Sequence, residues 1–274
     1  MNMVTPVQET PNYTAIKAKQ QATWASGNYA VVGTSIQMAG EELCETIDLK
    51  AGSVVLDVAA GNGNATLAAA RRFCAVTSTD YVPSLLDQAR ARAEAEGHAI
   101  RFETADVEDL PFDDESFEVV MSSFGAMFAP NQMQTAAEMT RVCKTGGTIA
   151  MANWTADGFV GQLFKTIGKH LPPPAGLQSP ARWGDRTALQ ELFGDKVSNI
   201  KMTPKVFTFR YTSFDHFLSV FRTYYGPIHK AFLALGDDGA ALEADIKALC
   251  DSLNRAGNDG FLVPSNYVIV DVTK

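Results

Sequence analysis

Apolar and polar positions alternate with two different periodicities along this chain, and these periodicities divide it into expected strands and helices. Short apolar runs bounded by glycine or polar turns predict strands, whereas apolar residues three or four positions apart predict amphipathic helices. The expected strands cover residues 54–58, 74–76, 100–103, 117–128 with the exit of that strand included, 148–153, 206–211 and 266–272. The expected helices cover residues 13–21, 34–47, an alanine-rich stretch between the first two strands, 83 to about 97, 132–143, 158–171, 187–193 and several stretches within 213–256.

The βαβ unit at residues 54–80 is the centre of this pattern. Its first strand ends in Asp57 and leads into the small-residue turn A-A-G-N-G-N, then an alanine-rich helix, and a second strand that ends in Asp80. Glycines let the backbone approach a ligand closely, and the free N–H groups of the following helix attract anions. Asp80 stands where a strand-end acid accepts hydrogen bonds from two ribose hydroxyls. The unit therefore predicts a site for a nucleotide-like ligand.

Two classes of cofactor use such a unit, and the details separate them. A dinucleotide site needs a small residue at the sixth position from the first glycine, where this chain has Thr66. The run instead resembles the nucleotide-binding motif hhhDhGxGxG of class I S-adenosylmethionine-dependent methyltransferases. Asp57, Gly61 and Gly63 match that motif, and Ala59 replaces its first glycine.

Three later segments resemble the same family in the same order. They are D-Y-x-P-S-x-L-x-x-A-R at 80–90, the A-D-V run at 105–107, and E-M-T-R-V-C-K-T-G-G at 138–147, whose two glycines we expect to end a helix. The resemblance covers residues 54–154 and is to the small-molecule branch typified by ubiquinone and menaquinone biosynthesis. It implies an α/β fold with a Rossmann-like seven-stranded, mostly parallel sheet and helices on both faces. An N-terminal helical arm and a helical lid insertion before the last strand would complete it.

The resemblance also implies S-adenosylmethionine as cofactor, S-adenosylhomocysteine as product, and roles for particular residues. Asp80 would hold the ribose, Tyr81 would flank the adenine or ribose, and Asp106 would accept a hydrogen bond from the adenine amine. Ser122 and Ser123 would lie beside the sulfonium. The full expected cofactor-binding set is Tyr29, Asp57, Ala59, Gly61, Gly63, Asp80, Tyr81, Ala105, Asp106, Val107, Ser122 and Ser123.

The arm and the insertion are expected to enclose a methyl acceptor. Both are rich in aromatic residues, which favours a small hydrophobic or aromatic molecule as substrate. The expected pocket residues are Trp24, Phe124, Met127, Phe128, Trp154, Trp183, Phe221 and Tyr225.

Methyl transfer requires proximity and alignment, and it requires a base only where the nucleophile has a high pKa. No motif identifies such a base. His229, with Tyr224 close by, is the best candidate because it lies among aromatic residues of the expected lid. A purely structural role for this histidine, and catalysis by proximity alone, both stay open.

Composition limits the remaining possibilities. The 274 residues carry a net charge of −8 and no run of basic residues, which argues against a protein that grips nucleic acid. The four cysteines show no C-x-x-C spacing, so we expect neither zinc nor a disulfide framework, and no metal. No apolar stretch reaches membrane-spanning length and no signal pattern starts the chain, so a cytoplasmic protein is expected. The oligomeric state stays open.

Four regions are expected: a disordered tail at 1–12, an arm at 13–50, the cofactor-binding core at 51–155, and the rest of the sheet with its insertion at 156–274. Three other functions compete with methyl transfer to a small molecule. A nicotinamide-dependent oxidoreductase is disfavoured by Thr66 and by the later motifs. A catalytically silent S-adenosylmethionine-binding module stays open because no base is assigned. A methyltransferase acting on RNA or protein is the third, and the acidic balance counts against RNA.

Overall fold

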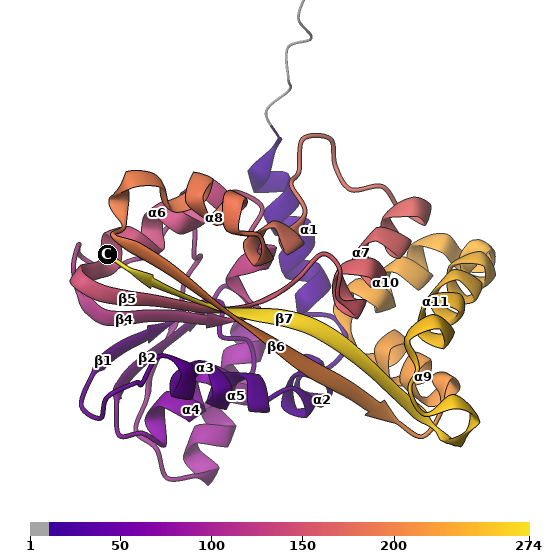
Figure 1. Cartoon of the computed structure of the whole chain (residues 1–274), viewed down its shortest axis with the longest axis horizontal. Helices are drawn as coiled ribbons and strands as arrows, with labels where there is room; N and C mark the ends of the chain where they lie inside the picture. Colours follow the sequence, from indigo (N-terminus) through magenta and orange to yellow (C-terminus); the bar gives the residue numbers. More distant parts are fainter. Residues whose placement is uncertain (1–10) are drawn as a thin grey trace, which may run out of the picture.

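A mixed sheet of seven strands forms the centre of the computed structural model, which describes residues 11–274 (Figure 1). The strand order is β3-β2-β1-β4-β5-β7-β6, and β7 runs antiparallel to both of its neighbours while the other adjacent pairs are parallel. The strands are β1 (Val54–Asp57), β2 (Ala75–Asp80), β3 (Arg101–Thr104), β4 (Phe117–Ser123), β5 (Cys143–Trp154), β6 (Asn199–Tyr211) and β7 (Phe261–Thr273). The predicted Rossmann-like, mostly parallel sheet of seven strands is confirmed.

Helices cover both faces of the sheet. The α-helices are α1 (Tyr13–Trp24), α2 (Tyr29–Ser35), α3 (Met38–Thr46), α4 (Asn64–Ala70), α5 (Pro83–Ala95), α6 (Gln132–Val142), α7 (Phe159–His170), α8 (Arg186–Phe193), α9 (Phe214–Tyr224), α10 (Gly226–Leu235) and α11 (Gly239–Leu253). Figure 1 shows α6 and α8 on one side of the sheet, α3, α4 and α5 on the other, and α7 grouped with α9, α10 and α11. Within residues 11–274, no helix is both long enough and apolar enough to cross a membrane.

Capping side chains begin several of these helices. Asn131, Asp185 and Ser213 each accept a hydrogen bond from the backbone N–H three residues later, which starts α6, α8 and α9. Asn12 does the same for α1. Residue 12 therefore belongs to the arm and not to the expected tail at 1–12, and residues 1–10 of that tail lie outside the described residues.

The arm differs from the prediction in where its helices begin and end. The expected helix at 34–47 is two helices, because α2 begins at Tyr29 and ends at Ser35 before α3 starts at Met38. Gly33 lies inside α2, where a Cβ would meet the Asn62 side-chain oxygen at 2.5 Å. A glycine that suggests a helix break in the sequence instead allows this helix to pack against the turn after β1.

The K-T-G-G run was expected to end a helix, and this prediction is wrong. Helix α6 ends at Val142, and β5 begins at the next residue. Phe117 pairs with Cys143 whereas Val119 pairs with Thr148, so residues 144–147 bulge out of the β4–β5 ladder. Gly146 makes this possible with a φ of +76°, and its N–H donates to the carbonyl of Lys274.

Strands β2, β6 and β7 are longer than the apolar runs that predicted them. In β2 the extra residues are polar but buried: Thr79 donates to the carbonyl of Asp57, and the Ser78 hydroxyl lies 2.8 Å from that of Thr66. β6 is an edge strand, where Pro204 removes no hydrogen bond that the sheet needs. Residues 261–266 of β7 pair with β6 alone, so these two strands extend as a ribbon beyond β5.

Candidate active site

The carboxyl ends of β1, β2 and β4 open into a pocket of about 780 Å³, called the turn pocket below. These neighbouring strands are parallel, so their ends meet at one edge of the sheet, where open α/β sheets bind ligands. Nine of the twelve residues expected at a cofactor line it: Tyr29, Ala59, Gly61, Asp80, Tyr81, Ala105, Asp106, Val107 and Ser123.

The turn after β1 forms one wall of this pocket. Ala59, Gly61 and Gly63 all have positive φ angles, of 49°, 57° and 84°. Gly63 does not line the pocket; a Cβ there would lie 2.9 Å from that of Ala89, so its role is to let α4 approach α5. Ala59 holds a backbone conformation that costs an alanine free energy and a glycine very little.

Asp80 connects this turn to the end of β2. One carboxylate oxygen accepts from the N–H of Gly61 at 2.9 Å and the other accepts from the N–H of Val82 at 2.8 Å. Burial raises the pKa of Asp80 to about 6, although both N–H groups favour the ionised form. A carboxylate has about four acceptor positions, so two stay free for a ligand in the pocket.

Asp57 and Ser122, which were also expected at the cofactor, do not line the pocket. Asp57 is fully buried, and one of its oxygens accepts from the Thr66 hydroxyl at 2.5 Å while the other has no partner among the described residues. Burial raises the pKa of Asp57 to about 7. Ser122 donates to the carbonyl of Val58 and accepts from the N–H of Ala126, so it joins the ends of β1 and β4.

Helix α1 lies over the turn pocket, and it supplies a lysine that sequence analysis missed. The Lys17 ammonium lies 2.6 Å from the carboxylate of Asp106 and 3.1 Å from that of Glu108. Gln20 and Gln21 donate to backbone carbonyls on either side of the pocket. These residues and Trp24 are spaced as one face of a helix, but the predicted helix ended at residue 21, before this spacing was complete.

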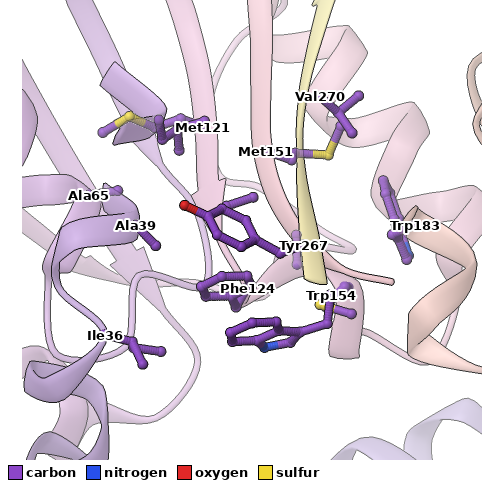
Figure 2. Packing of buried hydrophobic residues seen from close by; sticks show 14 of the residues in the cluster. Ile36, Ala39, Ala65, Met121, Phe124, Met151, Trp154, Trp183, Tyr267 and Val270 are labelled. Atoms are coloured by element: carbon purple, nitrogen blue, oxygen red, sulfur yellow. The ribbon is translucent and has the colours of Figure 1, made fainter. Parts of the chain in front are cut away.

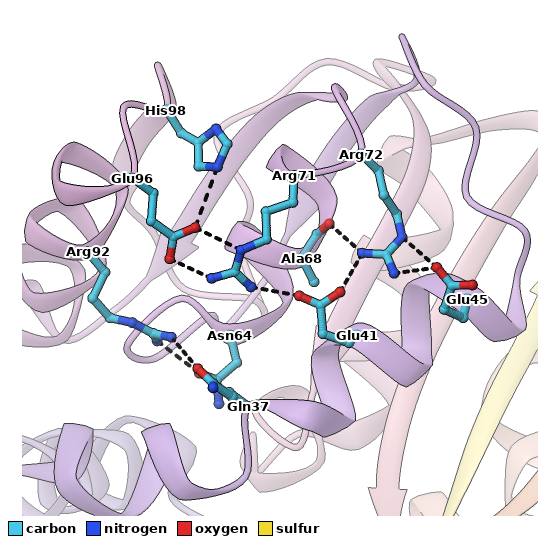
Figure 3. A network of polar contacts seen from close by, with 10 residues as sticks. All are labelled: Gln37, Glu41, Glu45, Asn64, Ala68, Arg71, Arg72, Arg92, Glu96 and His98. Atoms are coloured by element: carbon cyan, nitrogen blue, oxygen red, sulfur yellow. Dashed lines mark hydrogen bonds and ion pairs between the residues drawn. The ribbon is translucent and has the colours of Figure 1, made fainter.

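Arg92 of α5 holds the turn from the opposite side. It donates to the carbonyl of Asn62 at 2.6 Å and to the side-chain oxygen of Asn64 at 2.9 Å. Figure 3 shows the contact with Asn64 and, beside it, a separate group of ion pairs in which Arg71 joins Glu41 of α3 to Glu96. Asn62 and Asn64 line the turn pocket and were not singled out by the sequence.

A second space of about 430 Å³ adjoins the first and is called the aromatic cavity below. No acidic, basic or histidine side chain is among its twelve lining residues, which are Trp24, Tyr29, Val32, Ile36, Phe124, Phe128, Trp154, Val160, Leu163, Phe209, Phe221 and Tyr225. Four of them, Trp24, Tyr29, Phe124 and Phe128, also line the turn pocket. The two spaces therefore share a wall of aromatic rings.

Phe124 is the most constrained part of this wall (Figure 2). Its φ of +60° is unusual for a bulky residue, and its N–H donates to the carbonyl of Ala152. Its ring stacks on Trp154 with centroids 4.0 Å apart and planes 4° from parallel. A Cβ on the next residue, Gly125, would overlap the carbonyl oxygen of Ala59. Close packing between the ends of β1 and β4 thus sets the direction of the ring.

Four residues expected at the acceptor or in catalysis lie outside both spaces. Met127 and Trp183 are buried in the core, where Trp183 packs edge-on against Phe193. His229 is turned away, because its Nδ1 lies 2.8 Å from the carbonyl oxygen of Arg222 in the preceding helix. Tyr224 also contributes to neither lining, whereas its neighbour Tyr225 does.

The aliphatic part of the cavity was not predicted. Val32 and Ile36 come from the arm, and Val160 and Leu163 come from α7. Each occupies a position that apolar periodicity assigns equally well to the core. Phe209 on β6 has the same ambiguity.

Comparison with known proteins shows which family and which fold the chain resembles. Residues 55–147 match a family model described as "Methyltransferase domain". Uncharacterized protein Rv1403c of Mycobacterium tuberculosis (strain ATCC 25618 / H37Rv) is 37% identical over 256 residues, which cover 91% of this chain and 92% of that one. A demethylmenaquinone methyltransferase of Deinococcus radiodurans is 35% identical over 141 residues, covering 50% of this chain and 58% of the relative. The crystal structure of the YcgJ protein of Bacillus subtilis has a TM-score of 0.60 at 19% identity, covering 86% and 98% of the two chains.

Proposed function

Because the chain belongs to the class I S-adenosylmethionine-dependent methyltransferases, we propose that it methylates a small apolar or aromatic molecule. In this proposal the turn pocket binds S-adenosylmethionine and the aromatic cavity holds the acceptor. The observation that carries it is the wall shared by the two spaces, to which Trp24, Tyr29, Phe124 and Phe128 contribute. Residues that line both spaces mark the boundary where they meet, and molecules bound in the two spaces would come into contact at that boundary.

The residues of the turn pocket fit the cofactor. Asp80 has free acceptor positions for ribose hydroxyls, because its hydrogen bonds are to the backbone N–H groups of Gly61 and Val82. Asp106 and the backbone N–H of Val107 follow the end of β3, line the pocket and would meet the adenine. Gly61 lines the pocket with a φ of +57°, a conformation that favours glycine in this turn. When bound, S-adenosylmethionine supplies a methyl group on a positively charged sulfur. A lone pair of the acceptor can form a bond to the methyl carbon while the carbon–sulfur bond breaks.

The aromatic cavity limits the chemistry that the protein itself can perform. Its ionisable groups are two phenols, Tyr29 and Tyr225. Burial, and then the nearby charge of Asp80, raise the pKa of Tyr29 to about 12. Burial also raises the pKa of Tyr225. Neither phenol is a useful base at neutral pH, so the acceptor has to bring a lone pair that is already nucleophilic.

The protein itself would then contribute the position of the acceptor and the exclusion of water from the cavity. Rings from α1, α2, β5, β6 and α9 would fix the acceptor beside the turn pocket, and the apolar lining would keep out water that competes for the methyl group. Orientation of this kind accounts for large rate increases without a proton-transfer group. This matches a cavity that contains no histidine or carboxylate.

Calorimetric titration of the purified chain tests the cofactor assignment. We expect micromolar binding of S-adenosylmethionine and S-adenosylhomocysteine and no binding of NADPH. Asp80→Ala should weaken the first two by roughly 5- to 150-fold, because hydrogen bonds to a carboxylate contribute about 1–3 kcal/mol. Asp87→Ala, an exposed acid on the adjoining helix, is the matched control and should change nothing.

Transfer itself is measured with radiolabelled methyl groups and a panel of phenols and quinols. Incorporation into at least one of them is the expected result. Tight binding of the cofactor without incorporation into any acceptor would favour a silent binding module. Binding of NADPH in place of S-adenosylmethionine would overturn the assignment.

A further inference from the structure

The polar groups of the aromatic cavity indicate which kind of acceptor it favours. Tyr29 and Tyr225 both line the cavity, and neither hydroxyl is hydrogen-bonded to any residue within 11–274. Neither hydroxyl oxygen is among the buried side-chain atoms that lack a partner, so each is reached by solvent, and an acceptor atom of a ligand would take the place of water there. The rest of the lining is hydrocarbon and indole, and it carries no formal charge to pair with a charged ligand.

The two tyrosines differ in which of the two spaces they line. Tyr29 also lines the turn pocket, where Asp80 lies. Tyr225 lines only the aromatic cavity. The residue is 7% exposed, and its ring is held between those of Trp24 and Phe221, with centroids 5.8 Å and 5.2 Å away. The Tyr225 hydroxyl and the Trp154 indole N–H are therefore the donors of the aromatic cavity that belong to residues outside the turn pocket.

The backbone around Tyr225 is fixed as firmly as its ring. Tyr225 joins α9 to α10; its N–H donates to Phe221 and its carbonyl accepts from His229. At the next residue, a Cβ on Gly226 would overlap the carbonyl oxygen of Thr23 in α1. The arm and the insertion thus meet directly beside this tyrosine, which keeps its hydroxyl in one place.

The positive charge of the proposed cofactor also affects which acceptor the aromatic cavity favours. The proposed donor carries a positive sulfur beside the shared wall, and a second cation in an adjoining low-dielectric cavity would be repelled. Aromatic rings can bind cations, but no carboxylate lines this cavity to balance an ammonium group. A neutral or anionic oxygen, by contrast, is attracted by the donor and accepts a hydrogen bond from a phenol.

We propose that Tyr225 determines acceptor specificity by donating a hydrogen bond to the oxygen of an aromatic substrate, bound as a phenol or as the phenolate that can accept the methyl group. This rests on the proposed function, since it presumes that the aromatic cavity is the acceptor site. It excludes amines that are protonated at neutral pH from the preferred substrates. It also gives the enzyme a role in choosing the acceptor without making Tyr225 a base.

Binding of three simple probes tests the proposal. The probes are 2-naphthol, its hydrocarbon analogue naphthalene, and the trimethylanilinium cation, titrated by ligand-detected NMR into protein saturated with S-adenosylhomocysteine. We expect Tyr225→Phe to weaken 2-naphthol about fivefold to tenfold and to leave naphthalene within about twofold, because only the naphthol loses a hydrogen bond. Tyr224→Phe removes a hydroxyl one residue away, outside the cavity, and should change neither constant.

Two outcomes would overturn the proposal. Equal effects of Tyr225→Phe on naphthol and naphthalene would show that the hydroxyl does not touch the ligand's oxygen. Tighter binding of trimethylanilinium than of 2-naphthol would show that the rings form a cation site. Failure of the proposed function is distinguished in the same samples, because it appears as lack of S-adenosylhomocysteine binding while the probe titrations still report on Tyr225.

Discussion

The Lys17 ammonium lies 2.6 Å from the Asp106 carboxylate, and this ion pair ties helix α1 to the end of β3. The relationship matters because α1 contains no fully buried residue. Its attachment depends on Lys17, two glutamine side chains that bind backbone carbonyls, and the ring of Trp24. Opening of the arm should therefore cost much less free energy than unfolding of the sheet.

Removing the lysine should loosen the arm selectively. For Lys17→Met we expect amide hydrogen exchange in residues 13–24 to accelerate about fivefold, since a partly exposed ion pair contributes about 1 kcal/mol. Exchange in the central strands should not change. Lys19→Met is the control, because Lys19 is exposed on the same helix and has no ion pair with a described residue. Equal exchange in both variants would show that the ion pair does not hold the arm.

Gly125 should be among the least replaceable positions in the chain. A methyl group there would overlap the carbonyl of Ala59, so Gly125→Ala should reduce the free energy of unfolding by about 3 kcal/mol. It should also weaken cofactor binding, because Ala59 belongs to the turn. Gly168→Ala provides the contrast: a Cβ at this α7 position meets nothing within 4 Å, and alanine should be neutral or stabilising. Urea unfolding of both variants measures the difference.

Cofactor affinity should rise with pH between 5 and 7. The pKa of Asp80 is raised to about 6, and the ionised carboxylate is the form that accepts hydrogen bonds from ribose hydroxyls. Below that pKa the proton must leave before binding, so affinity should fall by up to about tenfold per pH unit. Calorimetry at pH 5, 6 and 7 checks the slope. In Asp80→Asn the affinity should be lower and nearly independent of pH, and an equal slope in that variant would assign the effect to another group.

The free energy of unfolding should fall as the pH rises, whereas the cofactor affinity should rise. Burial raises the pKa of Asp57 to about 7 in the folded chain, above its ordinary value near 4 when unfolded. The folded chain therefore holds this proton more tightly than the unfolded chain does. The resulting contribution to the free energy of unfolding is present at low pH and is lost as the pH rises through 7. Asp57→Asn should flatten this decline and make the chain more stable at pH 8, by on the order of a few kcal/mol. Thermal unfolding from pH 5 to 8 checks it.

The sequence was most informative where structure is local. Residues 54–80 carry strand, turn, helix and acid in one continuous run, so the turn pocket could be located from spacing alone. Lys17 could not be found in this way, because its partner Asp106 is 89 residues away and the predicted helix stopped before Trp24. The number of strands and their mostly parallel arrangement followed from the family resemblance and not from any pattern within the strands.

The residues expected at the aromatic cavity show where apolar periodicity is no longer sufficient to predict a site. Phe221 and Tyr225 line the aromatic cavity, while His229, one helical turn further along, is held by the carbonyl of Arg222. No residue of α10 lines the cavity, because the chain turns at Tyr225 and α10 packs against α9, which no local pattern records. Trp183 illustrates the same limit, since an aromatic residue that suits a pocket is equally suited to the core.

The ribbon of β6 and β7 has an evolutionary consequence. Helices α9, α10 and α11 leave the ribbon after Tyr211 and return at Phe261, and these two residues are paired with each other. The insertion therefore leaves the sheet and returns to it at one place, and changes in its length need not shift the register of any strand. Relatives could differ in the part of the proposed acceptor cavity that Phe221 and Tyr225 form through changes in this one continuous stretch.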